Sequence, residues 1–122
     1  MPKSGSPIAV TSDFLDQDVA LVVVEGEVDI SSASLVLSEL QIALRAPAPK
    51  VVVVDLTDVS FLGSEGVRLL IEADERAQSV SARLRVVASR RAVLRPLEIT
   101  GTLSKLDVYD SQALALKEAP VP

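Results

Sequence analysis

The chain has 122 residues, 48% of them hydrophobic, which suits one compact domain and argues against disorder. It lacks cysteine and histidine, which excludes disulfides, Cys/His metal sites and histidine acid–base catalysis. A net charge of −5 and 2% aromatic residues argue against binding to nucleic acid. Residues 1–7 do not resemble a signal peptide, and the apolar runs are shorter than the roughly 20 residues that span a bilayer. We therefore expect a cytoplasmic domain without a membrane anchor.

The first half of the chain predicts two strands and a helix. Residues 8–14 are expected to form an exposed strand, and the apolar, β-branched run 19–26 a strand covered on both faces. A helix is expected over 33–45, because its apolar residues recur at helical spacing and Pro47 ends the pattern.

The central segment is the most informative part of the sequence. Four valines predict a buried strand over 50–56, followed by a loop over 57–63 and a helix from Ser64 to residue 78. A serine at this position predicts an N-cap, which contributes about 1 kcal/mol. A phosphate on it would face the unpaired N–H groups of the helix. A capping role alone and a capping role with phosphorylation both stay open.

The last third continues the alternation. A strand is expected over 84–88, a helical segment over 89–101, a short strand over 106–109 and a short helix over 112–116. Pro96 predicts a kink or restart near Leu94 and Arg95. Strands separated by helices predict an α/β fold with a mixed, mostly parallel sheet of four to five strands and about four helices. The domain is expected over 8–116, between a disordered tail at 1–7 and a second tail at 117–122.

Catalysis by this chain is not expected. No Ser–Lys pair, paired carboxylates or phosphate-binding glycine loop stands out, so we expect neither an enzyme, a cofactor nor a metal site. A group of arginines is interpreted mainly as solvated faces and only weakly as a docking patch: Arg83, Arg85, Arg90, Arg91 and Arg95.

Three motifs carry a family resemblance. They are Gly26-Glu27-Val28-Asp29, the block from Val53-Val54-Asp55-Leu56 through Phe61-Leu62-Gly63-Ser64-Glu65-Gly66, and Leu97-Glu98-Ile99-Thr100-Gly101. With the order of elements, they resemble the STAS domain, the fold of bacterial anti-sigma factor antagonists, over residues 8–116. The resemblance implies a STAS-type fold.

The resemblance also implies a function. Such a domain binds an anti-sigma factor of the GHKL ATPase or serine kinase type and thereby releases a sigma factor. Phosphorylation of the serine matching Ser64 breaks the complex, and a serine phosphatase restores it. The domain is expected as a monomer or weak homodimer. The residues expected at the partner surface are Asp29, Ser31, Asp58, Gly63, Ser64, Glu65, Gly66 and Arg68.

This chain departs from the family pattern beside the phosphorylated serine. The family usually has Asp-Ser-Ser/Thr-Gly, whereas this chain has Gly63-Ser64-Glu65-Gly66. Gly63 is interpreted mainly as a residue that permits positive φ in a tight turn. Without the aspartate, an alternative function stays open: a docking subunit of a lipid-transport complex or stressosome-like scaffold, with no phosphorylation cycle.

Overall fold

The computed structural model describes residues 8–45 and 47–117. The strands are β1 (Ala9–Phe14), β2 (Val19–Val28), β3 (Val51–Leu62), β4 (Arg83–Val87) and β5 (Asp107–Tyr109). The helices are α1 (Ala33–Ala43), α2 (Ser64–Ser79), α3 (Arg91–Ile99) and α4 (Gln112–Lys117), with a short 3₁₀ turn, η1 (Leu103–Lys105). The expected tail at 1–7 lies outside the described residues. So does the second tail, except for Lys117, which ends α4.

The five strands form one mixed sheet in the order β1-β2-β3-β4-β5. β1 and β2 form an antiparallel hairpin, whose turn is held by Asp16: its Oδ1 accepts the N–H groups of Asp18 and Val19. The remaining neighbours are parallel. The predicted fold class is therefore confirmed, and β2, β3 and β4 deliver their carboxyl ends to the same edge.

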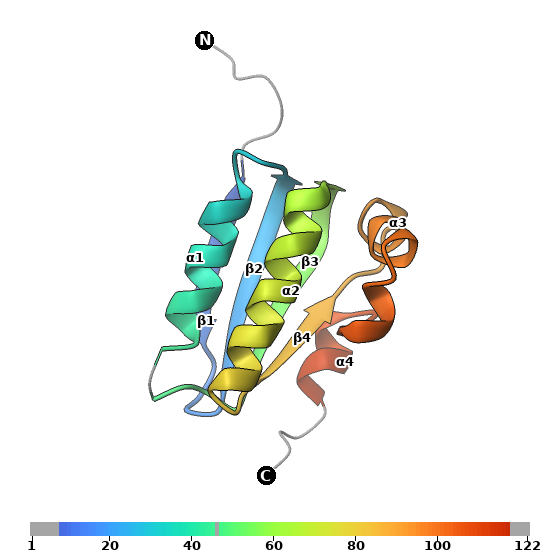
Figure 1. Ribbon diagram of the computed structural model, residues 1–122. Coiled ribbons are helices and arrows are strands. Elements are labelled where there is room, and N and C mark those ends of the chain that lie inside the picture. Colours follow the sequence, from blue (N-terminus) through green and yellow to red (C-terminus); the bar gives the residue numbers. More distant parts are fainter. Residues whose placement is uncertain (1–7, 46, 118–122) are drawn as a thin grey trace.

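Helices cover both faces of the sheet. Figure 1 shows α1 and α2 side by side on one face, α4 on the other, and α3 beside the carboxyl end of β3. The valines of β3 alternate between these layers: Val52 and Val54 join the core under α1 and α2, whereas Val51 and Val53 pack with Ala115 of α4. The alternation explains why the valine run lacks polar positions.

β3 is longer than the sequence predicts. The expected loop at 57–63 is wrong, because the strand continues to Leu62 beside the second half of β2. Two register shifts, between Val23 and Glu25 and between Gly26 and Glu27, each give β3 one extra residue. These bulges break the simple alternation from which a strand is recognised, so that Val59 and Leu62, three positions apart, both face the core.

The helix restart expected near Pro96 is wrong, because α3 continues through this residue. Pro96 supplies no N–H to the carbonyl of Ala92. Ala92 is an exposed residue at the molecular surface, where water can replace a missing hydrogen bond. The buried face of α3, Val93 and Leu97, is unaffected by the proline.

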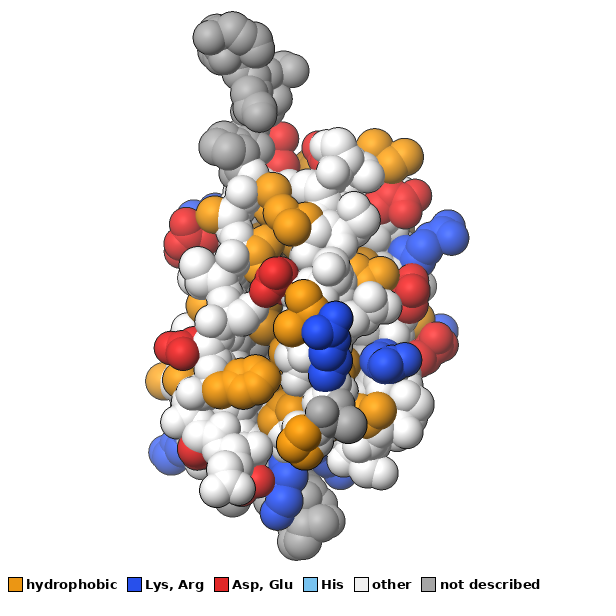
Figure 2. Space-filling model, turned by 90° about the vertical axis from the view of Figure 1, so that its left-hand side faces the viewer, with side chains coloured by type: hydrophobic (Ala, Val, Ile, Leu, Met, Phe, Trp, Pro, Cys, Tyr) orange, Lys and Arg blue, Asp and Glu red, His pale blue; other side chains and the backbone are white. Residues whose placement is uncertain are grey.

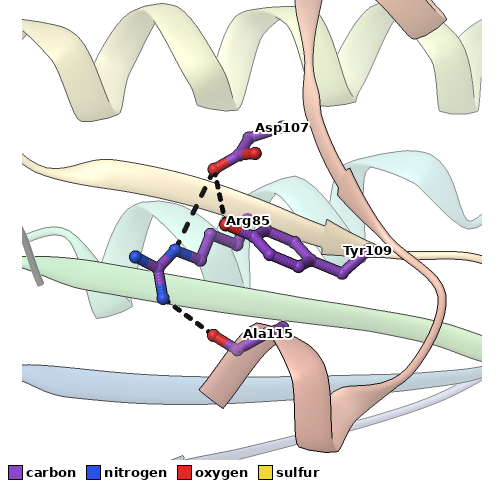
Figure 3. Close-up of polar contacts among 4 residues, drawn as sticks. All are labelled: Arg85, Asp107, Tyr109 and Ala115. Carbon is purple, nitrogen blue, oxygen red and sulfur yellow. Dashed lines mark hydrogen bonds and ion pairs between the residues drawn. The ribbon is translucent and has the colours of Figure 1, made fainter. Parts of the chain in front are cut away.

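Arg85 is buried, at 3% exposure, which corrects its interpretation as a solvated arginine. Its Nη1 donates to the carbonyl of Ala115 at 2.8 Å, and its Nε lies 3.9 Å from Oδ2 of Asp107 (Figure 3). Its guanidinium carbon lies 5.6 Å from the centre of the Tyr109 ring. Because both faces of β4 are covered, this side chain packs under α4 and helps to hold that helix.

Candidate functional site

The candidate site lies where β2 and β3 end side by side. Val28 pairs with Leu62 in the parallel register, and the N–H of Gly63 donates to the carbonyl of Val28 at 2.9 Å. The turn that follows β2 therefore lies next to the first residues of α2. The fold thus brings together two sequence motifs that are more than 30 residues apart.

Asp29 organises the turn after β2. Its Oδ1 accepts hydrogen bonds from the Ser31 hydroxyl at 2.8 Å and from the Ser31 and Ser32 N–H groups at 3.0 and 3.2 Å. The Ser31 hydroxyl is the main reason that the pKa of Asp29 lies below its usual value, because these donors favour the carboxylate. Asp29 thus holds the turn immediately before α1, whereas the N-cap of this helix is Ser32, which makes no side-chain capping hydrogen bond.

Ser64 is exposed and is the first residue of α2. The predicted N-cap role is wrong, since the cap is Gly63, whose carbonyl accepts the N–H groups of Gly66 and Val67 at 2.9 and 3.1 Å. The cap falls one residue earlier because β3 continues to Leu62 and leaves only Gly63 between strand and helix. The Ser64 hydroxyl has no hydrogen-bond partner among the described residues, so it is available at the surface.

The two glycines of this segment make room rather than supply positive φ. Gly63 has φ −82° and ψ −177°, an extended conformation open to other residues, which corrects the predicted reason for a glycine. A Cβ there would lie 3.1 Å from Cε2 of Phe61. Gly66 is buried, and a Cβ on it would lie 2.4 Å from Cδ1 of Leu62 and 3.1 Å from Cγ1 of Val28. Gly66 is therefore a packing residue.

The sequence predicts that Asp58 lies in a loop beside Ser64, but the structure places it elsewhere. It is an exposed residue within β3, opposite Glu25 of β2. It lies six positions before Ser64, a distance of about 15–20 Å in extended chain. Asp58 lies within a strand rather than a loop because β3 continues through two bulges to Leu62.

A shallow groove of about 170 Å³ between α1 and α2 adjoins Ser64. Glu65 and Arg68 of α2 line it together with Ile30 and Leu37. Arg68 lies one turn after Ser64 and forms no ion pair with any described residue. A guanidinium without a carboxylate partner can pair with a phosphate or an acidic group brought by another molecule.

Exposed apolar side chains surround this site, and the sequence reasoning above missed them. Ile30 is 80% exposed in the turn after β2, and Phe61 is 49% exposed at the end of β3. Ile99 of α3 is 70% exposed. The exposure of Ile30 could have been predicted from the sequence, because an isoleucine between Asp29 and two serines does not belong to the buried face of a helix. Apolar side chains beside polar ones are typical of protein interfaces.

Another hollow, of about 540 Å³, lies at the opposite end of α1 and is lined by Phe14, Ile42 and Pro47. Figure 2 views the side of the molecule on which β1 and α1 lie, and shows hydrophobic side chains among polar ones there. Ile42 belongs to the last turn of α1, whereas Ile30 precedes its first turn. This hollow therefore lies away from Ser64, and substitutions in it can serve as controls for substitutions near Ser64.

The described residues contain no cluster of three or more carboxylates that could hold a metal ion. Within the same ranges, none of the helices combines the length and the apolar character needed to cross a bilayer. Among the described residues, the site presents a hydroxyl, an acidic turn, an arginine without an ion pair and exposed apolar side chains. Such a surface can bind a protein, and its hydroxyl can be modified.

Comparison with known proteins places this geometry in context. The STAS domain model matches residues 15–115. The anti-sigma-F factor antagonist RsfB of Mycobacterium tuberculosis is 32% identical over 97 residues, which cover 79% of this chain and 78% of RsfB. The crystal structure of an anti-sigma factor antagonist from Mycobacterium paratuberculosis has a TM-score of 0.82 and 30% identity, over 91% of this chain and 92% of that one. Unphosphorylated SpoIIAA shares the fold, with a TM-score of 0.76 and 16% identity, over 89% and 94% of the two chains.

Proposed function

The chain belongs to the STAS domain family, and on this premise we propose that it is an anti-sigma factor antagonist. Its partner is an anti-sigma factor of the GHKL ATPase or serine kinase type, and formation of the complex releases a sigma factor. The similarity to RsfB across most of the chain supports this role. The structural observation that carries the proposal is the exposed Ser64 at the start of α2, between the Asp29 turn and exposed apolar side chains.

The partner surface in this proposal consists of the residues at the carboxyl ends of β2 and β3. Asp29 and Ser31 come from the turn after β2, whereas Gly63 caps α2 and Ser64 and Arg68 belong to the start of this helix. Glu65 lines the groove beside them, whereas Gly66 keeps α2 close to the sheet. Asp58 is left out because it lies further back along β3.

Phosphorylation of Ser64 by the kinase-type partner is the proposed switch. The N–H groups of Ser64 and Glu65 have no acceptor in the described part of the chain, so a phosphate at this helix start would find donors and a favourable dipole. The fold therefore tolerates the modified serine. The phosphate adds about two negative charges to the surface that the partner covers, which weakens the complex. Removal by a serine phosphatase restores binding.

The experiment compares wild type, Ser64→Ala and Ser64→Glu in calorimetric titrations against the purified ATPase-type anti-sigma factors of the source organism. Wild type and Ser64→Ala should bind one of them with similar affinity, and Ser64→Glu should bind at least about tenfold more weakly. Incubation with that factor and Mg-ATP, followed by mass spectrometry, should find phosphate on Ser64, with Ser64→Ala as the unmodified control.

The outcomes separate the two functions left open by the sequence. Absence of binding to every anti-sigma factor would contradict the antagonist role. Equal binding by all three forms, with Ser64 unmodified, would leave a docking domain without a phosphorylation switch.

A further inference from the structure

A second groove adjoins the proposed partner surface on the side of α3. It is an open groove of about 350 Å³ between the end of β3 and one face of α3. Phe61 and Leu62 of β3 line one side, and Arg91, Arg95, Pro96 and Ile99 of α3 line the other. These α3 residues share a helix face because they recur at three- and four-residue spacings. Below, this is called the α3 groove.

The α3 groove combines exposed apolar side chains with unpaired positive charge. Ile99 and Phe61 are 70% and 49% exposed, although both are large and apolar. Arg91 and Arg95 are exposed and form no ion pair with a described residue. No aspartate or glutamate lines the groove, even though the chain carries a net charge of −5.

The position of the arginines does not favour helix stability. Arg90 is the N-cap of α3, and Arg91 is its first residue. The cap has no side-chain hydrogen bond, and the first turn has no acidic residue. Positive charges at a helix N-terminus oppose the helix dipole. Residues that do not stabilise their own element, beside exposed apolar groups, point to binding.

We propose that the α3 groove docks an acidic, amphipathic segment of the anti-sigma factor, with carboxylates against Arg91 and Arg95 and apolar side chains against Phe61 and Ile99. This inference rests on the proposed function and adds the chemistry of the partner's contact. Aromatic and arginine side chains are the residue types that most often dominate binding energy at interfaces. The large exposed fraction of Ile99 suits a protein surface better than an enclosing small-molecule cavity.

The groove is continuous with the Ser64 surface. Phe61 lies two residues before Gly63, and a Cβ on Gly63 would come within 3.1 Å of its ring. A partner that covers Ser64 and extends along the end of β3 therefore reaches Phe61 first and then the face of α3. The two arginines would fix the orientation of that partner, because they bind carboxylates with defined geometry.

The test is a titration of the anti-sigma factor with the whole domain carrying Arg91→Glu and Arg95→Glu together. A matched control carries Lys50→Glu and Arg83→Glu, exposed residues at the amino ends of β3 and β4 that change the net charge equally. The groove variant should bind at least about tenfold more weakly, and the control within about twofold of wild type. Glutamate at the start of α3 favours the helix dipole, so the groove variant should remain folded, as thermal unfolding can verify.

A third variant, Ile99→Ser, tests the apolar half of the groove without changing charge and should weaken binding about tenfold. Equal affinity of wild type and the groove variants would overturn the inference and leave the antagonist role intact. Equal weakening by the groove variant and the control would also overturn it, since net charge alone would then explain the effect. If wild type bound no anti-sigma factor, the proposed function and this inference would fall together.

Discussion

Gly66 rests directly against Leu62, with 2.4 Å between Cδ1 of the leucine and the place where a Cβ would lie on the glycine. The first turn of α2 therefore packs on the end of β3 with no room for a side chain. This contact sets the position of Ser64, which lies two residues earlier in the same turn.

Gly66→Ala should displace the start of α2 and lower the free energy of unfolding by about 1–3 kcal/mol, because the added methyl group overlaps Leu62. Gly63→Ala is the matched control. Its Cβ would lie 3.1 Å from the ring of Phe61, an exposed side chain that can move away. Chemical denaturation of the two variants measures the difference, and equal stabilities would contradict the packing role of Gly66.

Ser64→Ala should leave the free energy of unfolding within about 0.5 kcal/mol of wild type, because the serine side chain is exposed and forms no capping hydrogen bond. Ser32→Ala should cost about 1–2 kcal/mol. Ser32 is 7% exposed, and its hydroxyl donates to the carbonyl of Glu27 at 2.7 Å and accepts the N–H of Asp29 at 3.0 Å. Thermal unfolding compares the pair. If Ser64→Ala lowered the free energy of unfolding by about 1 kcal/mol, Ser64 rather than Gly63 would be the cap of α2.

The sequence predicts the order of the elements well, because each strand and helix has its own apolar period. It predicts the end of β3 poorly. The bulges near Leu56 and Ser60 shift the alternation, and Asp58 with Ser60 makes the stretch resemble a loop. The supposed cap at Ser64 and the supposed turn at Asp58 both follow from that one error.

Arg85 and Ile30 show a second limit of sequence reasoning. Burial of Arg85 depends on α4, which lies 30 residues later and supplies the carbonyl of Ala115. Exposure of Ile30 depends on how the β2–α1 turn is folded by Asp29. In both cases the environment of the side chain is decided by tertiary contacts that the local pattern does not contain.

Gln112→Ala should loosen α4 from the sheet and lower the free energy of unfolding by about 1–3 kcal/mol. The Gln112 Nε2 donates to Oδ2 of Asp55 at 2.7 Å, and Asp55 is only 6% exposed. The variant leaves a nearly buried carboxylate with one donor fewer. Gln41→Ala, an exposed change in α1, is the control and should be close to neutral. Hydrogen exchange should also become faster in α4, and unchanged exchange would contradict this anchoring role.

Asp74→Asn should raise the melting temperature at neutral pH. Burial, with smaller contributions from the charges of Glu75 and Asp107, raises the pKa of Asp74 above its usual value, although the bond from Gln78 opposes this. A raised pKa means that the folded state binds the proton more tightly than the unfolded state, so the stability that Asp74 contributes at low pH is lost as pH rises through the folded pKa. An asparagine avoids that loss and keeps an acceptor for Gln78.

The gain in melting temperature of Asp74→Asn should shrink as pH falls towards and below the ordinary pKa of an aspartate, because Asp74 is then protonated in both the folded and the unfolded state. Melting curves of wild type and Asp74→Asn between neutral and acidic pH test the trend. Asp13→Asn, an exposed change in β1, controls for the loss of one charge. A gain that stays constant across the range would contradict the assignment to the proton of Asp74.

Ile30→Ser should weaken binding to the anti-sigma factor about tenfold and leave the melting temperature unchanged. Ile30 is 80% exposed, so the folded domain loses little packing, whereas a partner seated over Ser64 loses an apolar contact in the groove between α1 and α2. Ile42→Ser is the matched control, because Ile42 is 43% exposed at the far end of α1. Calorimetric titration of both variants decides the matter. Equal effects on affinity would remove Ile30 from the partner surface, and a large drop in stability would assign it to the fold instead.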